Sequence, residues 1–218
     1  MNVKDEGKIV IMGDLQGSRK LDSEERYKAQ LFLKLTLAQI NENYSEYVEA
    51  PFMITKGDEF QGVLTNISVA FDILLDLERL LYPLYFRFGM GMGLIHKMGG
   101  TLPIEMDGPA FHLANKALKK AKQIKQNIII YSGNEFVDQL VNQILILVYS
   151  IKKQWKEDYF QYYWQYKELK SIKKIAEYRN ISAQAVSSAI QRLHIKEIYS
   201  AEETTKNLLC NHKDKEQQ

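Results

Sequence analysis

The sequence predicts an α+β fold, in which helices pack on a mostly antiparallel sheet, followed by a small all-α module. Three observations support this prediction. Short apolar runs typical of strands alternate with amphipathic helical segments, a tight turn joins two of the strands, and the chain beyond the last strand has only helical periodicity. With 218 residues, 45% of them hydrophobic, the chain is long enough for one medium-sized domain and a smaller one.

The first elements are a strand, a helix and a hairpin. The apolar run 9–12 predicts a buried strand that ends at Asp14. Apolar residues at helical spacing predict an amphipathic helix over about residues 23–44. Two strands at about 51–55 and 60–64 are so close in sequence that an antiparallel hairpin with the tip "KGDE" is the only economical connection.

The next elements complete the sheet. A second helix is predicted over 68–81, before Pro83. In the strand 86–94, large apolar residues alternate with Arg87 and three glycines, so one face is almost bare and another group must approach it closely. A helix over 109–123 and a short strand in "NIIIYSG" follow. The order β, α, β, β, α, β, α, β is close to the ferredoxin-like plan.

The domain organisation follows from these elements. We expect the α+β domain to span residues 1–133, a connecting helix 134–156, the helical module 157–210 and a disordered tail 211–218. No internal repeat or low-complexity segment interrupts this order.

Composition constrains the function only slightly. The 29 basic and 27 acidic residues give a net charge of +2, which makes no case for a nucleic-acid or membrane partner, although the chain beyond Ser150 is mildly basic. A single cysteine, Cys210, rules out an internal disulfide. No apolar stretch approaches the roughly 20 residues of a membrane span. We therefore expect a cytoplasmic protein with no membrane partner.

Two aspartates form the first candidate site. Asp14 ends the first strand and Asp58 lies at the hairpin tip, and the two meet if the hairpin strands flank that first strand. Carboxylates are the ligands that Mg²⁺ prefers, and Gly13 and Gly57 beside them would let a polyphosphate approach the backbone. The alternative for "GDE" is an ordinary turn, because glycine and aspartate are common turn residues.

The motifs around these aspartates resemble known families. "GDLQGSR" resembles the first-strand motif of class III nucleotidyl cyclases, and "KGDEF" resembles both their hairpin aspartate and the GGDEF signature of diguanylate cyclases. Over nearly its full length the chain resembles the SatD family of bacterial proteins. That resemblance rests on the "GD..GSR" start, the "GDEFQG" hairpin, the glycine-alternating strand and the "MDGPAFH" helix, before a C-terminal segment of DNA-binding type.

The cyclase resemblance implies roles for several residues. Asp14 and Asp58 match the two metal aspartates, which would hold Mg²⁺ or Mn²⁺, and the carbonyl of Leu15 would be a third ligand. His112 and Lys116 stand where cyclases carry the Asn and Arg that stabilise the transition state, so they are the catalytic candidates. For His112 the alternative is a half-buried helix residue, and Lys116 lacks the planar fork of arginine.

A nucleoside triphosphate is the partner that this resemblance implies. Lys56 replaces the first glycine of GGDEF, so cyclic dinucleotide synthesis is not inferred, and Lys56 and Arg19 are instead candidates for phosphate contact. The expected nucleotide-binding residues are Gly13, Leu15, Gly17, Arg19, Lys56, Gly57 and Lys116.

The segment "KIAEYRNISAQAVSSAIQRLHI" has the spacing of a helix-turn-helix. Ala176 would be the small residue between the two helices, Asn180 the left-handed turn residue, Ile181 the turn anchor, and Val186 and Ile190 the buried face. The residues expected to face DNA are Lys173, Lys174, Ser182, Gln184, Ser187, Ser188, Gln191 and Arg192. Ser182 is also a good N-cap for the second helix. The alternative is a module for dimerisation or peptide binding.

These features predict a two-domain regulator, of transcription or of a stress response, that binds a nucleotide with Mg²⁺ and also DNA. Class III cyclase sites form between two subunits, so the resemblance implies a homodimer. One alternative is an active nucleotidyl cyclase or a related enzyme that uses two-metal chemistry on a triphosphate. A second is a degenerate cyclase fold that serves as a dimerisation scaffold.

Overall fold

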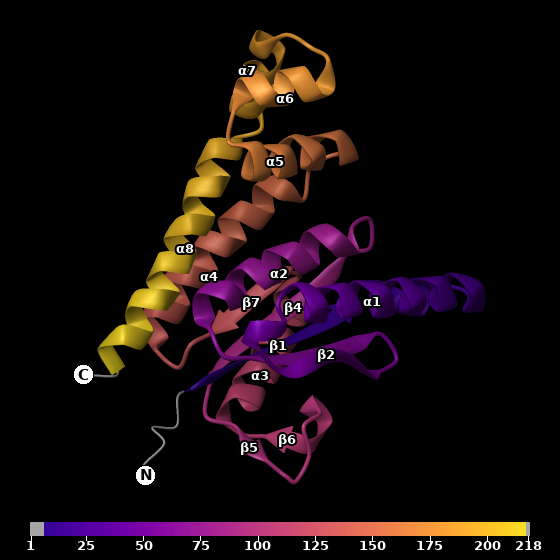
Figure 1. The fold of residues 1–218 in the computed structure, drawn as a ribbon, viewed down its shortest axis with the longest axis vertical. Coiled ribbons are helices and arrows are strands. Elements are labelled where there is room, and N and C mark those ends of the chain that lie inside the picture. The colour runs from indigo at the N-terminus through magenta and orange to yellow at the C-terminus, as the bar shows by residue number, and fades with distance from the viewer. Residues whose placement is uncertain (1–6, 217–218) are drawn as a thin grey trace. The chain divides into compact units, whose positions relative to one another are not determined.

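The fold is described for residues 7–216 of a computed structural model of the protein (Figure 1). The chain forms two compact units. One consists of the residues up to Asn142 together with the end of the chain from Leu208, and the other is Gln143–Asn207. No helix within residues 7–216 combines the length and the apolar character that a membrane span needs.

The first unit is built on a five-stranded sheet in which β1 is central (Figure 1). Every neighbouring pair is antiparallel except β4 and β7, which run parallel. The strands, in their order across the sheet, are β2 (Val48–Lys56), β3 (Glu59–Leu64), β1 (Lys8–Leu15), β4 (Phe86–Gly93) and β7 (Ile128–Tyr131). The first four strands have the ferredoxin-like order, which confirms the predicted α+β fold.

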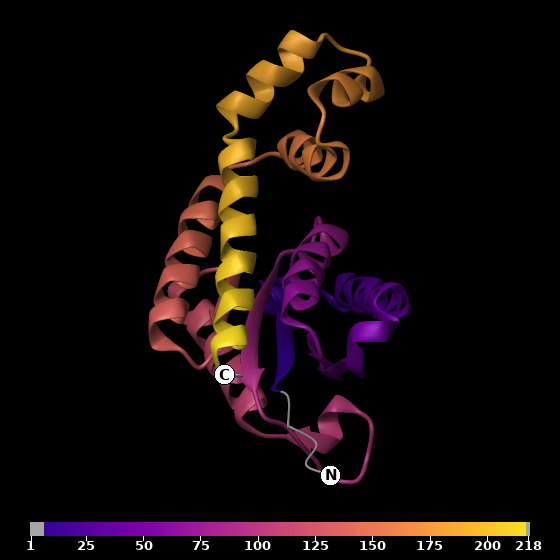
Figure 2. The same cartoon turned by 60° about the vertical axis from the view of Figure 1, so that its left-hand side comes forward.

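Helices cover both faces of this sheet (Figure 2). The helices α1 (Ser23–Asn43) and α2 (Ile67–Leu81) lie on one face, and α3 (Pro109–Ile124) lies on the other. The start of α1 is fixed by a capping box, because Asp22 accepts from the backbone of Glu25 while the Glu25 carboxylate accepts from the backbone of Asp22.

The glycine-bearing face of β4 is closed by α3. A Cβ placed at Gly89 would collide with the α3 backbone at Ala114 and Leu118, and one at Gly91 would collide with it at Ala110. Small residues on both elements therefore let the helix axis approach the strand closely. The group that the sequence required beside this bare face is a helix of the same chain.

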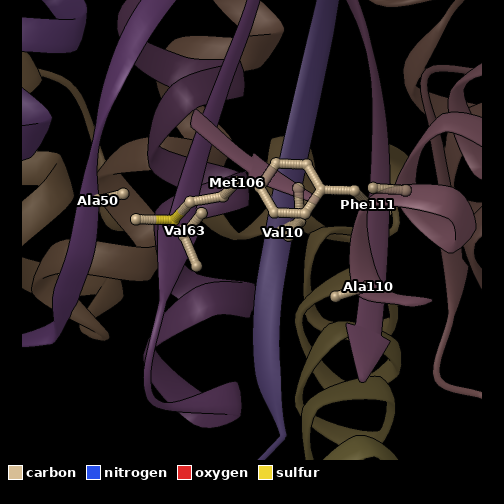
Figure 3. Close-up of a cluster of buried hydrophobic side chains, with 7 residues drawn as sticks. Val10, Ala50, Val63, Met106, Ala110 and Phe111 are labelled. Atoms are coloured by element: carbon tan, nitrogen blue, oxygen red, sulfur yellow. The ribbon is translucent and has the colours of Figure 1, made fainter. Parts of the chain in front are cut away.

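A cluster of apolar side chains extends this layer over β1, β2 and β3 (Figure 3). The ring of Phe111 from α3 lies beside Val10 of β1, and Met106 lies near Val63 of β3. Met106 belongs to β6 (Met106–Asp107), which pairs with β5 (His96–Lys97) in a separate two-stranded ribbon. The even-numbered positions of β1 thus face α3, and Asp14 lies on the same face as Val10 because strand side chains alternate.

The second unit is entirely helical. It contains the end of α4 (Glu135–Lys152) and most of α8 (Ile195–Glu216), and between them lie α5 (Glu157–Leu169), α6 (Ile172–Arg179) and α7 (Ala183–Arg192). Its core includes a buried carboxylate, since Glu202 is only 2% exposed. Glu202 accepts a hydrogen bond of 2.6 Å from the Tyr163 hydroxyl, and the ammonium groups of Lys167 and Lys152 lie 3.3 and 3.7 Å from it.

The end of α8 lies in the segment predicted as a disordered tail. The helix continues to Glu216, beyond the start of the tail predicted at residues 211–218, and the last two residues lie outside the described part of the chain. The segment from Asn211 to Glu216 contains no glycine or proline to stop a helix, and Lys and Glu are good helix formers.

Candidate functional site

Asp14 and the hairpin that carries Asp58 are neighbours in the sheet. Asp14 is directly opposite Glu59 of β3 and Arg87 of β4, because β1 pairs with both strands. Gly57 and Asp58 form the two-residue tip between β2 and β3. Gly57 has a φ of 61°, the left-handed conformation that a tight hairpin turn requires and that glycine adopts without strain.

A lysine from α3 bridges two of the acidic residues. The Nζ of Lys122 lies 3.1 Å from Oδ1 of Asp14 and 3.0 Å from Oε1 of Glu59. A guanidinium nitrogen of Arg87 lies 3.9 Å from the other oxygen of Asp14, and its Nε is buried and has no hydrogen-bond partner among the described residues. Asp14 and Glu59 thus face two cations, and Asp58 precedes Glu59 directly in the chain. We call Asp14, Asp58, Glu59, Arg87 and Lys122 the acidic cluster.

The acidic residues of the acidic cluster outnumber its basic residues by three to two. Burial raises the pKa of the Asp14 carboxyl above its ordinary value of 3.8, and the carboxylates of Asp58 and Glu59 raise it further against the opposing effect of Lys122. Burial lowers the pKa of Lys122, but hydrogen bonds to Glu59 and Asp14 outweigh this effect and leave it raised. Lys122 is therefore charged at neutral pH.

Asp58 carries an unsatisfied oxygen. Its Oδ2 is buried and has no hydrogen-bond partner within the described part of the chain. A buried polar atom without a partner costs free energy, so such atoms are uncommon in folded proteins and call for an explanation. A bound cation or a hydrogen-bond donor of a ligand would satisfy this oxygen.

The donor set at this edge suits a cation that arrives with a polyphosphate. Mg²⁺ is usually held by one or two carboxylates, while substrate phosphates and water complete its shell. Asp14 and Asp58 meet that requirement chemically. Residues 7–216 contain no group of three or more His, Cys, Asp or Glu arranged to hold a metal ion by themselves, and Lys122 already compensates Asp14. These residues therefore fit an ion whose remaining ligands come from phosphate groups and water, and they do not supply all of its ligands themselves.

The residues expected to contact phosphate occupy different environments. Gly13 packs under Phe60, since a Cβ there would collide with the Phe60 ring, and Leu15 is a buried strand residue opposite Phe86. Exposed positions beyond the end of β1 and at the hairpin tip are Gly17, Arg19, Lys56 and Gly57. Gly17 has a φ of 77° and, like Gly57, has open space where a side chain would be.

The two catalytic candidates lie elsewhere on α3. They line an open pocket of about 530 Å³. Four further residues of α3 that carry amide or ammonium groups and one tyrosine of β7 complete its lining. The full lining is His112, Asn115, Lys116, Lys119, Lys120, Gln123 and Tyr131.

These candidates have partners of their own. The Nε2 of His112 is 3.7 Å from Asp107, and Nζ of Lys116 is 5.0 Å from the centre of the Tyr131 ring. Neither Asp14 nor Asp58 lines the pocket. A single chain therefore does not bring the catalytic candidates to the acidic cluster.

Three members of the acidic cluster were not predicted as site residues. Glu59 follows Asp58 directly in the "GDEF" motif, and Arg87 alternates with the glycines of β4, so the sequence placed both beside the predicted site. The sequence indicated Lys122 less clearly. It follows the buried Ala121 on α3, and only the packing of that helix on β1 turns its side chain to Asp14.

In the helical unit, the connection between α6 and α7 has the expected turn. Asn180 is left-handed, with a φ of 53°, and the amides of Asn180 and Ile181 donate to the carbonyls of Glu177 and Ala176. The hydroxyl of Ser182 accepts from Ala185, as an N-cap does. The predicted anchor Ile181 is wrong, because its side chain is 40% exposed. Its backbone closes the turn, so its side chain is not needed in the core.

The outward face of α7 is polar. Val186 and Ile190 are buried, as predicted. Arg192 lies 5.7 Å from the centre of the Tyr159 ring, and Lys173 forms a long i, i+4 ion pair with Glu177. The residues expected to face DNA, all on exposed positions, are Lys173, Lys174, Ser182, Gln184, Ser187, Ser188, Gln191 and Arg192. Their assignment to DNA remains a prediction.

A model of the SatD family matches residues 8–209 of the chain. No curated protein sequence matches it at a significant level. Among solved structures, a bacterial light-regulated adenylyl cyclase is 19% identical with a TM-score of 0.43, over 57% of this chain and 74% of that chain.

Two further solved structures are guanylyl cyclase domains. The dimeric domain of the RhoGC fusion protein from the fungus Blastocladiella emersonii is 15% identical with a TM-score of 0.43, over 52% of this chain and 74% of that one. The catalytic core of a rhodopsin-guanylyl cyclase with converted specificity, in complex with ATPαS, is 18% identical with a TM-score of 0.40, over 52% and 72%. These are domains of the class whose motifs the sequence resembles.

Proposed function

The chain belongs to the SatD family, and we propose that it is a regulator whose sheet-containing unit binds a nucleoside triphosphate with Mg²⁺ or Mn²⁺ and whose helices α6 and α7 bind DNA. The observation that carries the first half is the acidic cluster, in which the buried Oδ2 of Asp58 has no partner within the described residues. Asp14 and Asp58 would hold the ion there.

The residues around the cluster suit a polyphosphate. Lys56 and Arg19 are exposed and bring positive charge to the hairpin tip and to the segment after β1. Gly17 and Gly57 leave their backbones open to a bulky anion. When bound, the divalent ion would neutralise phosphate charge and fix the orientation of the phosphates.

Binding is better supported than turnover. In one chain, His112 and Lys116 line the pocket on α3 and pair with Asp107 and Tyr131, away from Asp14. A complete catalytic site would therefore need these residues from a second copy, which agrees with the homodimer that the class III resemblance implies. The replacement of the transition-state Asn and Arg by His112 and Lys116 also favours a nucleotide-responsive regulator over an efficient enzyme.

Titration calorimetry with each common NTP in the presence of Mg²⁺ or Mn²⁺ tests the nucleotide half. We expect at least one NTP to bind, and Asp58→Asn to weaken this binding about tenfold or more because it removes a charged ligand of the ion. Glu42→Gln, an exposed change on α1, serves as the control for loss of one negative charge. If no NTP with either metal gives heat, the protein does not bind nucleotides and the scaffold alternative is favoured. Formation of a product that Asp58→Asn abolishes would favour the enzyme.

The DNA half is supported by the exposed polar face of α7 beside the αL turn at Asn180. We expect the full-length protein to bind a DNA fragment from its own promoter region with an affinity that falls steeply with salt, as phosphate contacts require. Lys174→Ala should weaken binding to all sequences, whereas Gln184→Ala should lose about 1–3 kcal/mol of discrimination between sequences.

Fluorescence anisotropy at several salt concentrations measures both effects. Gln161→Ala, an exposed change on α5, is the matched control and should leave binding unchanged. Identical binding by the wild type, Lys174→Ala and Gln184→Ala would contradict a role of α6 and α7 in DNA recognition.

A further inference from the structure

Lys122 takes a position that a metal ion would otherwise take. Its ammonium group bridges Asp14 of β1 and Glu59 of β3 at 3.1 and 3.0 Å, so one cation links carboxylates from two strands. Divalent ions at clustered carboxylates do the same, with oxygen ligands at about 2.0–2.6 Å. The bridging oxygen of Asp14 cannot direct the same lone pairs to the ammonium and to a metal ion.

The lysine is held by charge more than by packing. The side chain of Lys122 is 35% exposed, while that of Asp14 is 15% exposed, so the lysine end has a route to solvent. The attachment of α3 to the sheet depends on the close contact at Gly89 and Gly91 and on buried residues such as Ala117. The ammonium group of Lys122 can therefore leave the carboxylates without releasing the helix.

The rest of the cluster shows what a divalent ion would find. Asp58 keeps an oxygen without a partner within the described residues, and the second oxygen of Asp14 has only Arg87 at 3.9 Å. These two carboxylate oxygens thus have little positive charge near them, while Lys122 occupies the position between Asp14 and Glu59. A free divalent ion has to compete with the ammonium group of Lys122 for these carboxylates. An ion that is bound to a polyphosphate arrives with anionic groups, which attract that ammonium group away from the carboxylates.

We propose that Lys122 determines the cation requirement of the acidic cluster by standing in for a divalent ion at Asp14 and Glu59 until a nucleotide phosphate displaces its ammonium group. This inference rests on the proposed nucleotide-binding function for the displacement step. Its first half, competition between Lys122 and a free divalent ion, concerns the chain alone. The displaced ammonium would then contact the phosphate that displaced it.

The test measures Mn²⁺ binding to the full-length protein without nucleotide, by the loss of the free-ion signal in electron paramagnetic resonance. We expect Lys122→Gln to bind Mn²⁺ about tenfold more tightly or better than the wild type, because a unit charge some 3 Å from the ligands no longer repels the ion. Lys122→Arg, which keeps the charge, should resemble the wild type. Lys34→Gln, an exposed change on α1, should also leave the affinity unchanged.

The double variant Asp14→Asn/Lys122→Gln locates the ion and should lose the gained affinity. Lys122→Met, which keeps the apolar stem of the side chain, repeats the test if Lys122→Gln unfolds. Equal Mn²⁺ affinity of the wild type and both charge-removing variants would overturn the proposal, whether that shared affinity is strong or absent.

The failure of this inference is distinguishable from failure of the proposed function. If the charge-removing variants gain Mn²⁺ affinity but no NTP binds the wild type, the competition stands and nucleotide binding fails. If an NTP binds the wild type and the charge-removing variants bind Mn²⁺ no more tightly than the wild type, the proposed nucleotide binding stands and the proposed role of Lys122 fails.

Discussion

At the scale of single residues, Asp14 is the most informative member of the acidic cluster. It is a carboxylate on the central strand, largely buried, with two further carboxylates nearby, so its charged form is disfavoured although Lys122 is within ion-pair distance. A position that served stability alone would hold a neutral residue there. Residues retained at a cost to stability commonly mark sites that interact with a ligand.

We predict that Asp14→Asn raises the melting temperature at pH 7 in metal-free buffer. Because the pKa of Asp14 in the folded protein lies above its ordinary 3.8, the stability it contributes is greatest below that value and is lost as the pH rises through the folded pKa. The advantage of the asparagine variant should therefore shrink as the pH falls toward 3.8. Thermal melts between pH 4 and 7 measure this trend.

Glu42→Gln, at an exposed position, is the control for loss of an acidic group and should show no such gain. A lower melting temperature of Asp14→Asn at pH 7 would mean that the ion pair with Lys122 outweighs the burial of Asp14.

At the scale of elements, α3 connects the fold with the site. One face of the helix packs on the glycines of β4, and Lys122 at the edge of this face contacts the acidic cluster. The exposed face of the helix forms the pocket with His112 and Lys116. A shift of this helix along the strand would move all of these groups together. The small residues at the contact therefore position the candidate site as well as the core.

We predict that Gly91→Ala destabilises the protein by about 1–3 kcal/mol, because its Cβ would collide with the α3 backbone at Ala110, which cannot move aside as a side chain can. Chemical denaturation of the full chain measures the change. Gly7→Ala is a matched control, since its Cβ would meet Gly93 at an ordinary 3.7 Å, and it should stay within about 0.5 kcal/mol. Equal stability of the two variants would contradict the close contact between α3 and β4.

At the scale of the whole molecule, the candidate groups are divided within each chain. Asp14 and Asp58 belong to the acidic cluster, whereas His112 and Lys116 line the pocket on the exposed face of α3. A homodimer in which α3 of one copy faces the cluster of the other would join them.

Mixing two defective variants tests this arrangement. Asp58→Asn and Lys116→Ala should each bind NTP weakly, but a mixed dimer has one site with both residues intact. Equal amounts refolded together should regain about a quarter of the wild-type sites, since about half of the dimers are mixed and each has one good site of two. Calorimetric stoichiometry gives this number. Binding by the mixture at only the average of the two parents would place the whole site within one chain.

Periodicity in the sequence was sufficient to predict most elements of the fold. Alternation predicted β4, helical spacing predicted α1, α2 and α3, and the tight spacing around "KGDE" predicted the hairpin. These patterns are local, because each reflects which side of one element is buried. The prediction was weakest at Ile181, whose side chain is exposed.

From the sequence alone, Asp14 and Asp58 were predicted to meet if the hairpin flanks the first strand, and a strand and a hairpin of fixed order leave few ways to form the sheet. Only the tertiary structure decided what surrounds them. The contact of Lys122 with Asp14 and Glu59 depends on the rotation of α3 against β1 and β4, and the filling of the bare glycine face by α3 depends on the same packing. Such long-range contacts arise from the fit of surfaces distant in the sequence, which no local pattern encodes.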